Sequence, residues 1–160
     1  MAIINNFIEK EFNPFNVIGI QIRSEYLRNS VKKDIERFIR CSEYLEKNYF
    51  KSTKQIKWFV SSDSLDVINT LKSRFPKKII FGDGEIKHIS LQNAGHKRAI
   101  IDVELLSRTN ILVLTGGSTF GFISSMKSKR FNYAIDTNSN ETCHKISMSK
   151  PGRDNKDNVV

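Results

Sequence analysis

Strand-like and helix-like segments alternate along most of this 160-residue chain. Short apolar runs typical of strands span Phe15–Arg23, Gln55–Val60, Lys78–Phe81, Asn110–Leu114 and Phe131–Ile135. Between them lie amphipathic stretches typical of helices, at Ser30–Tyr49, Ser62–Phe75, His96–Arg108 and Ser118–Ser128. This alternation favours parallel strands joined by right-handed helical crossovers. We therefore predict an α/β fold with a doubly wound parallel sheet, in which the first strand is central and the strand order is 3-2-1-4-5.

The polar C-terminal segment sets the expected limits of the folded unit. From Asp136 onward the chain is polar, and residues 150–160 have a composition typical of disorder. We predict one domain over residues 15–136, followed by a partly disordered tail over residues 137–160.

The net charge of +9 favours anionic partners, such as nucleotides, nucleic acids or an anionic membrane surface. The basic residues are spread along the chain, however, and form no polybasic tail or arginine-rich arm. No apolar run approaches the length of a membrane span, and the first 15 residues lack the pattern of a signal peptide. We expect no nucleic-acid partner and no membrane contact by this chain itself.

The two cysteines, Cys41 and Cys143, are too few for a disulfide scaffold, and their positions leave a single disulfide between them open. The three histidines, His88, His96 and His144, show no metal-ligand spacing either. We expect no metal.

The segment from Asn110 to Gly121 carries the clearest functional signal. An apolar strand runs into the Gly116-Gly117 turn, and Ser118 stands where a helix should begin. Glycine allows a ligand to approach the backbone, and the free amides of a helix start attract anions such as phosphate. An ordinary strand-turn-helix connection with a serine cap is the alternative, and the pattern alone favours it.

A second strand strengthens the phosphate hypothesis, because the run Val17–Ile22 ends in Arg23. Arginine can grip a phosphate through two nitrogens at once. In the predicted strand order, Arg23 and the Gly116–Thr119 turn meet at the carboxyl edge of the sheet, with Ser61-Ser62-Asp63 beside them. The last segment has a simpler alternative role as the cap of the following helix. No G-x-G-x-x-G dinucleotide fingerprint follows the first strand.

Three segments, in this order, resemble fucosyltransferases: Ile18–Arg23 (GIQIR), Asp102–Ser107 (with LLS) and Ser118–Gly121 (STFG). The resemblance is closest to the plant xyloglucan type, glycosyltransferase family 37, and more distant to the α-1,6- and protein O-fucosyltransferases. It covers about Val17 to Pro151. The tail is also similar, through Cys143, Met148-Ser149 and Pro151, although Gly152 follows where the family has cysteine.

The resemblance implies a Rossmann-like domain that is the C-terminal, donor-binding half of a two-domain (GT-B) glycosyltransferase. It implies an enzyme that transfers fucose from GDP-fucose to a glycan acceptor with inversion and without a metal or other cofactor. It also implies the Golgi lumen and fucosylation of cell-wall glycans or glycoproteins. The family's acceptor domain and membrane anchor are not in this chain, which leaves a fragment, a truncated product and a diverged short form as interpretations.

The resemblance also assigns donor-site roles. Arg23 would grip the β-phosphate and stabilise the departing diphosphate, as the catalytic cation. The turn would hold the phosphates through Gly117, Ser118, Thr119 and Phe120, although Phe120 is also typical of a core residue.

Four more residues are donor-site candidates. Asp102 would accept hydrogen bonds from the guanine edge; its alternative is a charge on the helix surface. Ser62, Asp63 and His96 would lie near the same edge, although for His96 the sequence favours the alternative of a solvated or capping residue. No acidic residue can be identified as a general base.

Two other functions compete with a fucosyltransferase donor domain. One is a non-catalytic module that binds nucleotides or nucleotide-sugars. The other is a basic α/β domain that binds RNA, which would favour basic and aromatic residues clustered on one sheet face; the sequence lacks that pattern. The acceptor, the linkage and the oligomeric state are not predicted by the sequence.

Overall fold

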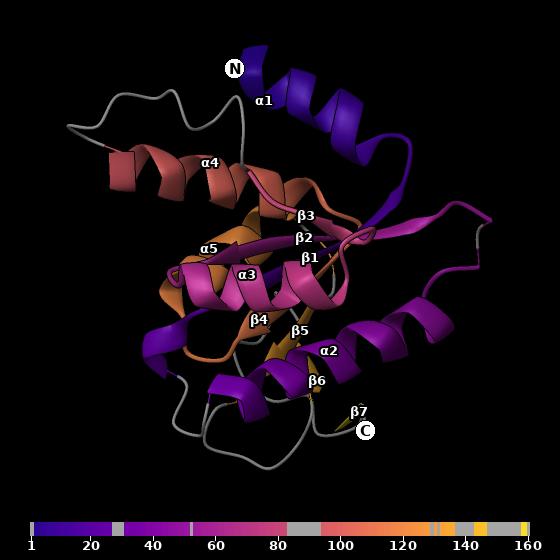
Figure 1. The fold of residues 1–160 in the computed structure, drawn as a ribbon, viewed down its shortest axis with the longest axis vertical. Helices are drawn as coiled ribbons and strands as arrows, with labels where there is room; N and C mark the ends of the chain where they lie inside the picture. The colour runs from indigo at the N-terminus through magenta and orange to yellow at the C-terminus, as the bar shows by residue number, and fades with distance from the viewer. Residues whose placement is uncertain are drawn as a thin grey trace.

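A computed structural model describes residues 2–26, 31–51, 53–82, 94–128, 130, 132–136, 143–146 and 158–159. Within them the strands form one sheet in the order β3-β2-β1-β4-β5-β6-β7 (Figure 1). The strands are β1 (Asn16–Ile22), β2 (Ile56–Ser62), β3 (Ile79–Ile80), β4 (Ile111–Thr115), β5 (Asn132–Ile135), β6 (Cys143–Ile146) and β7 (Asn158–Val159).

The central part of the sheet confirms the predicted fold. Strands β1 to β5 are parallel and follow the order 3-2-1-4-5, with β1 between β2 and β4. Every residue of β1 is buried, as expected for a strand covered on both faces. The sheet then continues past the predicted strands, because β6 pairs antiparallel with β5 and β7 pairs antiparallel with β6.

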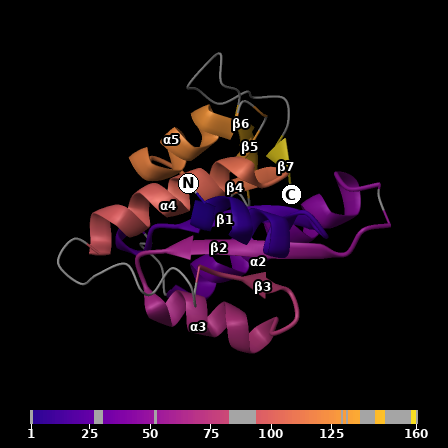
Figure 2. The same cartoon turned by 90° about the horizontal axis from the view of Figure 1, so that it is seen from above.

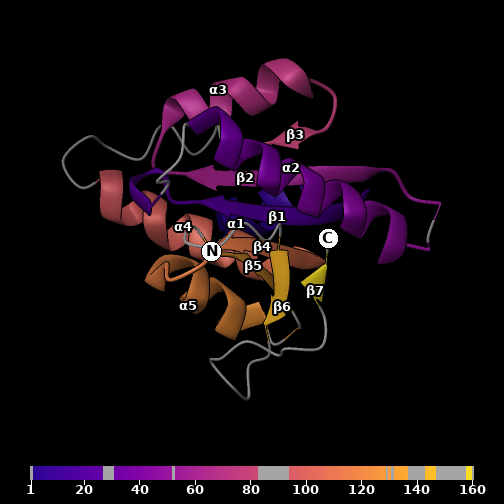
Figure 3. The ribbon, with the colours of Figure 1, turned by 90° about the horizontal axis from the view of Figure 1, so that it is seen from below.

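Helices cover both faces of the sheet (Figures 2 and 3). Helices α2 (Val31–Asn48) and α3 (Leu65–Arg74) pack on one face, over a core that includes Phe38 and Trp58. On the other face lie α4 (Ala94–Arg108) and α5 (Thr119–Ser128), over a core that includes Leu105 and Leu106. All four helices fall where the sequence predicts them. No helix in the described part of the chain has both the length and the apolar character that a membrane span requires.

The start of α3 differs from the prediction. Strand β2 extends through Ser62, and the residue that caps the helix is Ser64, whose hydroxyl accepts from the Val67 amide. The alternative that Ser61-Ser62-Asp63 is the helix cap is therefore wrong. Ser61 and Ser62 instead end β2 at the carboxyl edge of the sheet, and Asp63 follows directly after the strand.

Two N-terminal segments that precede residue 15 pack against the predicted domain. Helix α1 (Ala2–Phe7) and the π-helical turn η1 (Ile8–Phe12) place Phe7 and Phe12 against Phe59 of β2, with ring centroids 6.2 and 5.4 Å away. The sequence pattern gave no signal for these turns. Most of residues 137–160, where a tail is predicted, lies outside the described residues, as do residues 83–93.

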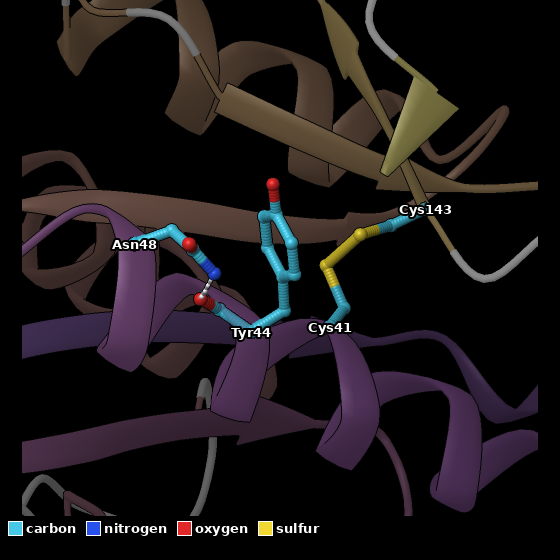
Figure 4. Close-up of a disulfide and its surroundings, with 4 residues drawn as sticks. All are labelled: Cys41, Tyr44, Asn48 and Cys143. Atoms are coloured by element: carbon cyan, nitrogen blue, oxygen red, sulfur yellow. Dashed lines mark hydrogen bonds between the residues drawn. A yellow bond between two sulfur atoms is a disulfide. The ribbon is translucent and has the colours of Figure 1, made fainter. Parts of the chain in front are cut away.

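A disulfide joins Cys41 of α2 to Cys143 of β6 (Figure 4). Their Cα atoms are 6.0 Å apart, within the range that a disulfide spans without backbone movement. Tyr44, one turn further along α2, points to the same side of the helix as the disulfide. This bond resolves the pairing that the sequence leaves open, and it fastens the antiparallel edge of the sheet to a helix.

Candidate functional site

The carboxyl ends of β1 and β4 are tied together at one point of the sheet edge. The backbone amide of Arg23 donates to Thr115 Oγ1 at 2.9 Å, and the same hydroxyl donates to the carbonyl of Gln21 at 3.0 Å. The Gln21 side chain in turn accepts from the Thr115 amide at 3.2 Å. As a result, the backbone at Arg23, just past β1, is tied to Thr115, the residue before the glycine turn that follows β4.

Arg23 is held by two carboxylates. Its Nη2 atom lies 2.7 Å from Glu25 Oε2, and its Nε atom lies 3.4 Å from Asp63 Oδ2. The other oxygen of Asp63 accepts from the backbone amide of Ser24 at 2.7 Å. Partial burial alone would raise the pKa of Asp63, but the hydrogen bonds from Ser24 and the charge of Arg23 lower it below its ordinary value. Arg23 is 39% exposed at its side chain, so a ligand can reach it.

The turn after β4 leads directly into the start of α5. Gly117 has a φ of 77°, and a Cβ placed on it would meet nothing within 4 Å. The Ser118 hydroxyl accepts from the Gly121 amide at 3.3 Å, so Ser118 caps α5 as predicted. Ser118 is buried and its own amide donates to the Thr115 carbonyl, which leaves exposed Thr119 to offer the hydroxyl nearest solvent.

Phe120 packs against the core cluster beneath α5 and is only partly exposed. The structure thus gives its side chain the core role that the sequence left as an alternative. Only the backbone of Phe120 is then available to a ligand. It lies in the first turn of α5, where the helix dipole favours an anion.

Asp102 is 5% exposed, which rules out the alternative of a charge on the helix surface. Ser61 Oγ donates to its Oδ2 atom at 2.7 Å, and Arg98 Nε donates to its Oδ1 atom at 2.7 Å. Burial raises the pKa of Asp102, although Arg98 and the hydrogen bond from Ser61 oppose the rise. The guanidinium of Arg98 is itself fixed by a bond from Nη1 to the carbonyl of Gly82 at 3.0 Å.

The sheet register places these groups at one level of the carboxyl edge. Gln21 of β1 lies opposite Ser61 of β2 and Leu114 of β4. Asp102 is hydrogen-bonded to Ser61 near the end of β2. Thr115 lies one residue beyond Leu114, and Arg23 lies two residues beyond Gln21, just past the end of β1. The buried carboxylate of Asp102, the guanidinium of Arg23 and the first amides of α5 thus lie toward the same edge of the sheet.

Two of the residues predicted for the site, Ser62 and His96, have no described side-chain contact with its other members. Ser62 is half-buried and its hydroxyl accepts from the Ser64 amide at 3.2 Å, which is a local turn contact. His96 lies in the first turns of α4, and its side chain is outside what the structure describes. Among the described residues, no group of three or more His, Cys, Asp or Glu side chains could hold a metal ion.

Sequence reasoning missed three residues that shape the site: Gln21, Arg98 and Thr115. Two of them carried a readable signal. Gln21 is a polar residue in an otherwise apolar buried strand, and Arg98 precedes Asp102 by four residues, the spacing of a helical ion pair. Thr115 looked like the end of an apolar run, and only the parallel pairing of β1 with β4 gives it its role.

Comparison with solved structures shows which known proteins share the fold of this chain. The chain resembles fucosyltransferase NodZ from Bradyrhizobium with a TM-score of 0.65 and 19% sequence identity, over 91% of this chain and 45% of that one. The fold is that of about half of a fucosyltransferase. A NodZ α-1,6-fucosyltransferase co-crystallised with GDP gives a TM-score of 0.64 at 19% identity, over 91% of this chain and 46% of that one.

A plant enzyme gives the same result. A mutant of Arabidopsis thaliana FUT1 in complex with GDP matches with a TM-score of 0.65 and 18% identity, over 90% of this chain and 35% of that one. This chain thus spans less than half the length of the fucosyltransferases it resembles. No family model matches the sequence, and no curated protein matches it either.

Proposed function

We propose that this chain is a fucosyltransferase donor domain that binds GDP-fucose at the carboxyl edge of β1 and β4. The observation that carries the proposal is the hydrogen bond from the backbone amide of Arg23 to Thr115, which joins the end of β1 to the strand that leads into the Gly116–Thr119 turn. The solved structures with this fold include fucosyltransferases in complex with GDP and soaked with GDP-fucose. An exposed guanidinium beside a helix start offers two kinds of donor to a diphosphate.

Each group at the edge then has a role in donor binding. Arg23 contacts the β-phosphate and stabilises the charge that develops as GDP leaves. The amides of Thr119 and Phe120, with the Thr119 hydroxyl, hold the phosphates above Gly117. Ser118 acts by capping the helix that presents those amides.

Asp102 is the proposed acceptor for the guanine edge, whose paired N–H groups suit a carboxylate. Because both of its oxygens already accept hydrogen bonds, guanine must share Asp102 with Ser61 or displace Arg98. His96 and Ser62 remain proposed neighbours of the base.

The proposal extends to transfer of fucose onto a glycan acceptor, with inversion and without a metal, in the lumen of the Golgi. The Cys41–Cys143 disulfide supports an oxidising compartment, because such bonds persist in secreted and luminal proteins. Plant xyloglucan-type enzymes are the proposed relatives. The chain spans only part of the enzymes it resembles, so catalysis would also require the remainder of such an enzyme. A nucleotide-sugar binding module is the second candidate, because every group described above serves binding.

Nucleotide-dependent thermal melts test the proposal. GDP should raise the melting temperature, because a ligand at 100 times its Kd adds about 2.7 kcal/mol to the stability of the folded state. UDP should raise it much less. Equal shifts with GDP and UDP would remove the role of Asp102, and no shift with either would reject the donor site. Turnover of GDP-fucose with and without an oligosaccharide acceptor then separates an enzyme from a binding module.

A further inference from the structure

The two carboxylates that contact Arg23 differ in how they are held. Asp63 is 21% exposed at its side chain and has a second anchor, the backbone amide of Ser24. Glu25 is 67% exposed at its side chain, and within the described part of the chain it pairs with Arg23. Breaking the Asp63 contact would therefore disturb the chain just after β1, whereas the Glu25 side chain can move away without that cost.

They also take different parts of the guanidinium. Asp63 contacts Nε, the inner nitrogen, while Glu25 contacts Nη2, one of the two outer nitrogens. A phosphate that binds the guanidinium end-on takes its two outer nitrogens. Glu25 consequently occupies a position that a phosphate oxygen would take, while Asp63 does not.

The charges add to this difference. One guanidinium with two carboxylates leaves a single net negative charge at the point where a diphosphate would bind. Displacing Glu25 removes the opposing charge from the contact and restores a net neutral Arg23–Asp63 pair. An exposed ion pair is weak enough for a multiply charged ligand to break.

We propose that Asp63 is a positioning residue that aims Arg23 at the donor diphosphate, and that Glu25 is an internal competitor that occupies Arg23 until the diphosphate displaces it. This inference rests on the proposed function, since it assumes that a nucleoside diphosphate binds at Arg23. It assigns Asp63 a role through Arg23, in place of the direct donor contact expected from the sequence.

Titration calorimetry with GDP on three charge variants of the full chain tests the inference. Glu25→Gln should bind GDP about 2- to 5-fold more tightly than the wild type, the range that an exposed ion pair can supply. Asp63→Asn should bind it about 3- to 10-fold more weakly, because the guanidinium loses its inner support. Asp66→Asn, the matched control, makes the same charge change in the first turn of α3 without a described contact to Arg23, and should leave the affinity unchanged.

A double-mutant cycle separates positioning from general damage. Replacing Arg23 by Lys should weaken GDP binding less in the Asp63→Asn background than in the wild type. In that background the guanidinium of Arg23 is no longer oriented by Asp63, so less is lost when it is replaced. Additive effects would overturn the positioning role. Equal affinities of Glu25→Gln and Asp66→Asn would overturn the competitor role while the wild type still binds GDP. A wild type that binds no GDP would instead reject the proposed function itself.

Discussion

Arg23 tests the donor site at the scale of one residue. Arg23→Lys keeps the charge but replaces a two-pronged group by a point charge, so we expect GDP affinity to fall by about 1.5–3 kcal/mol. Thr119→Val removes one exposed hydroxyl at nearly constant volume and should cost about 0.5–1.5 kcal/mol. Calorimetry beside a thermal melt measures both, and the melts without ligand should barely change. Normal GDP binding by Arg23→Lys, or unfolding of that variant, would make Arg23 a structural residue.

Asp102 predicts a pH effect at the same scale. Because its pKa is raised on folding, the folded state holds the Asp102 proton more tightly, and this contribution to stability is lost as pH rises from 3.8 through the folded pKa. Asp102→Asn cannot titrate there. The free energy of unfolding of Asp102→Asn relative to the wild type should therefore increase as pH rises through that window.

Denaturant titrations at several pH values measure the effect, with Ser61→Ala as the companion variant. Removing the Ser61 hydrogen bond takes away a contact that lowers the pKa of Asp102 in the folded state. In Ser61→Ala, the pH range over which the stability falls should therefore extend to higher pH. If the difference in the free energy of unfolding between Asp102→Asn and the wild type did not change with pH, the raised pKa of Asp102 would be contradicted.

At the scale of elements, the Gly116–Ser118 turn shows what local sequence predicts well. The turn, the cap and the start of α5 follow from residue types that act within a few positions. Asp102 shows the opposite case. Its burial depends on Ser61, which is 41 residues away, and on the crossing of α4 over β2, so no local pattern could exclude a surface position.

Gly117 gives the element-scale prediction. Since a Cβ there meets no atom within 4 Å, an alanine would strain only the backbone, at about 1–2 kcal/mol of stability. Asparagine tolerates positive φ better, so Gly117→Asn should cost less than Gly117→Ala. Chemical denaturation measures both variants. Equal costs for the two substitutions would mean that the turn has relaxed away from the positive φ that opens it to a ligand.

At the scale of the whole molecule, the strand order was predictable and the edge of the sheet was not. Strands β1 to β5 are joined by crossovers that obey general rules of handedness, and those rules leave few topologies. Strand β6 is four residues long and contains His144 and Lys145, so its pattern resembles a polar tail. It joins the sheet by pairing with β5 and by its disulfide, and neither contact is local in the sequence.

The Cys41–Cys143 disulfide therefore carries the last prediction. It links residues 102 positions apart, and closing a loop of about 100 residues in the unfolded chain is worth about 4.7 kcal/mol in the chain-entropy model. The double variant Cys41→Ala with Cys143→Ala, which avoids burying two hydroxyls, should lose about 2–5 kcal/mol of unfolding free energy.

The reduced wild type is the control, because it should match the double variant in denaturant titrations, while the variant should not respond to reductant. The disulfide joins α2 to β6, and Arg23 and the Gly117–Thr119 turn depend instead on the pairing of β1 with β4. The folded double variant should therefore keep the GDP affinity of the wild type. If removing the disulfide abolished GDP binding in a protein that still melts cooperatively, the donor edge would depend on β6 as well, and the site could not be confined to β1, β2 and β4.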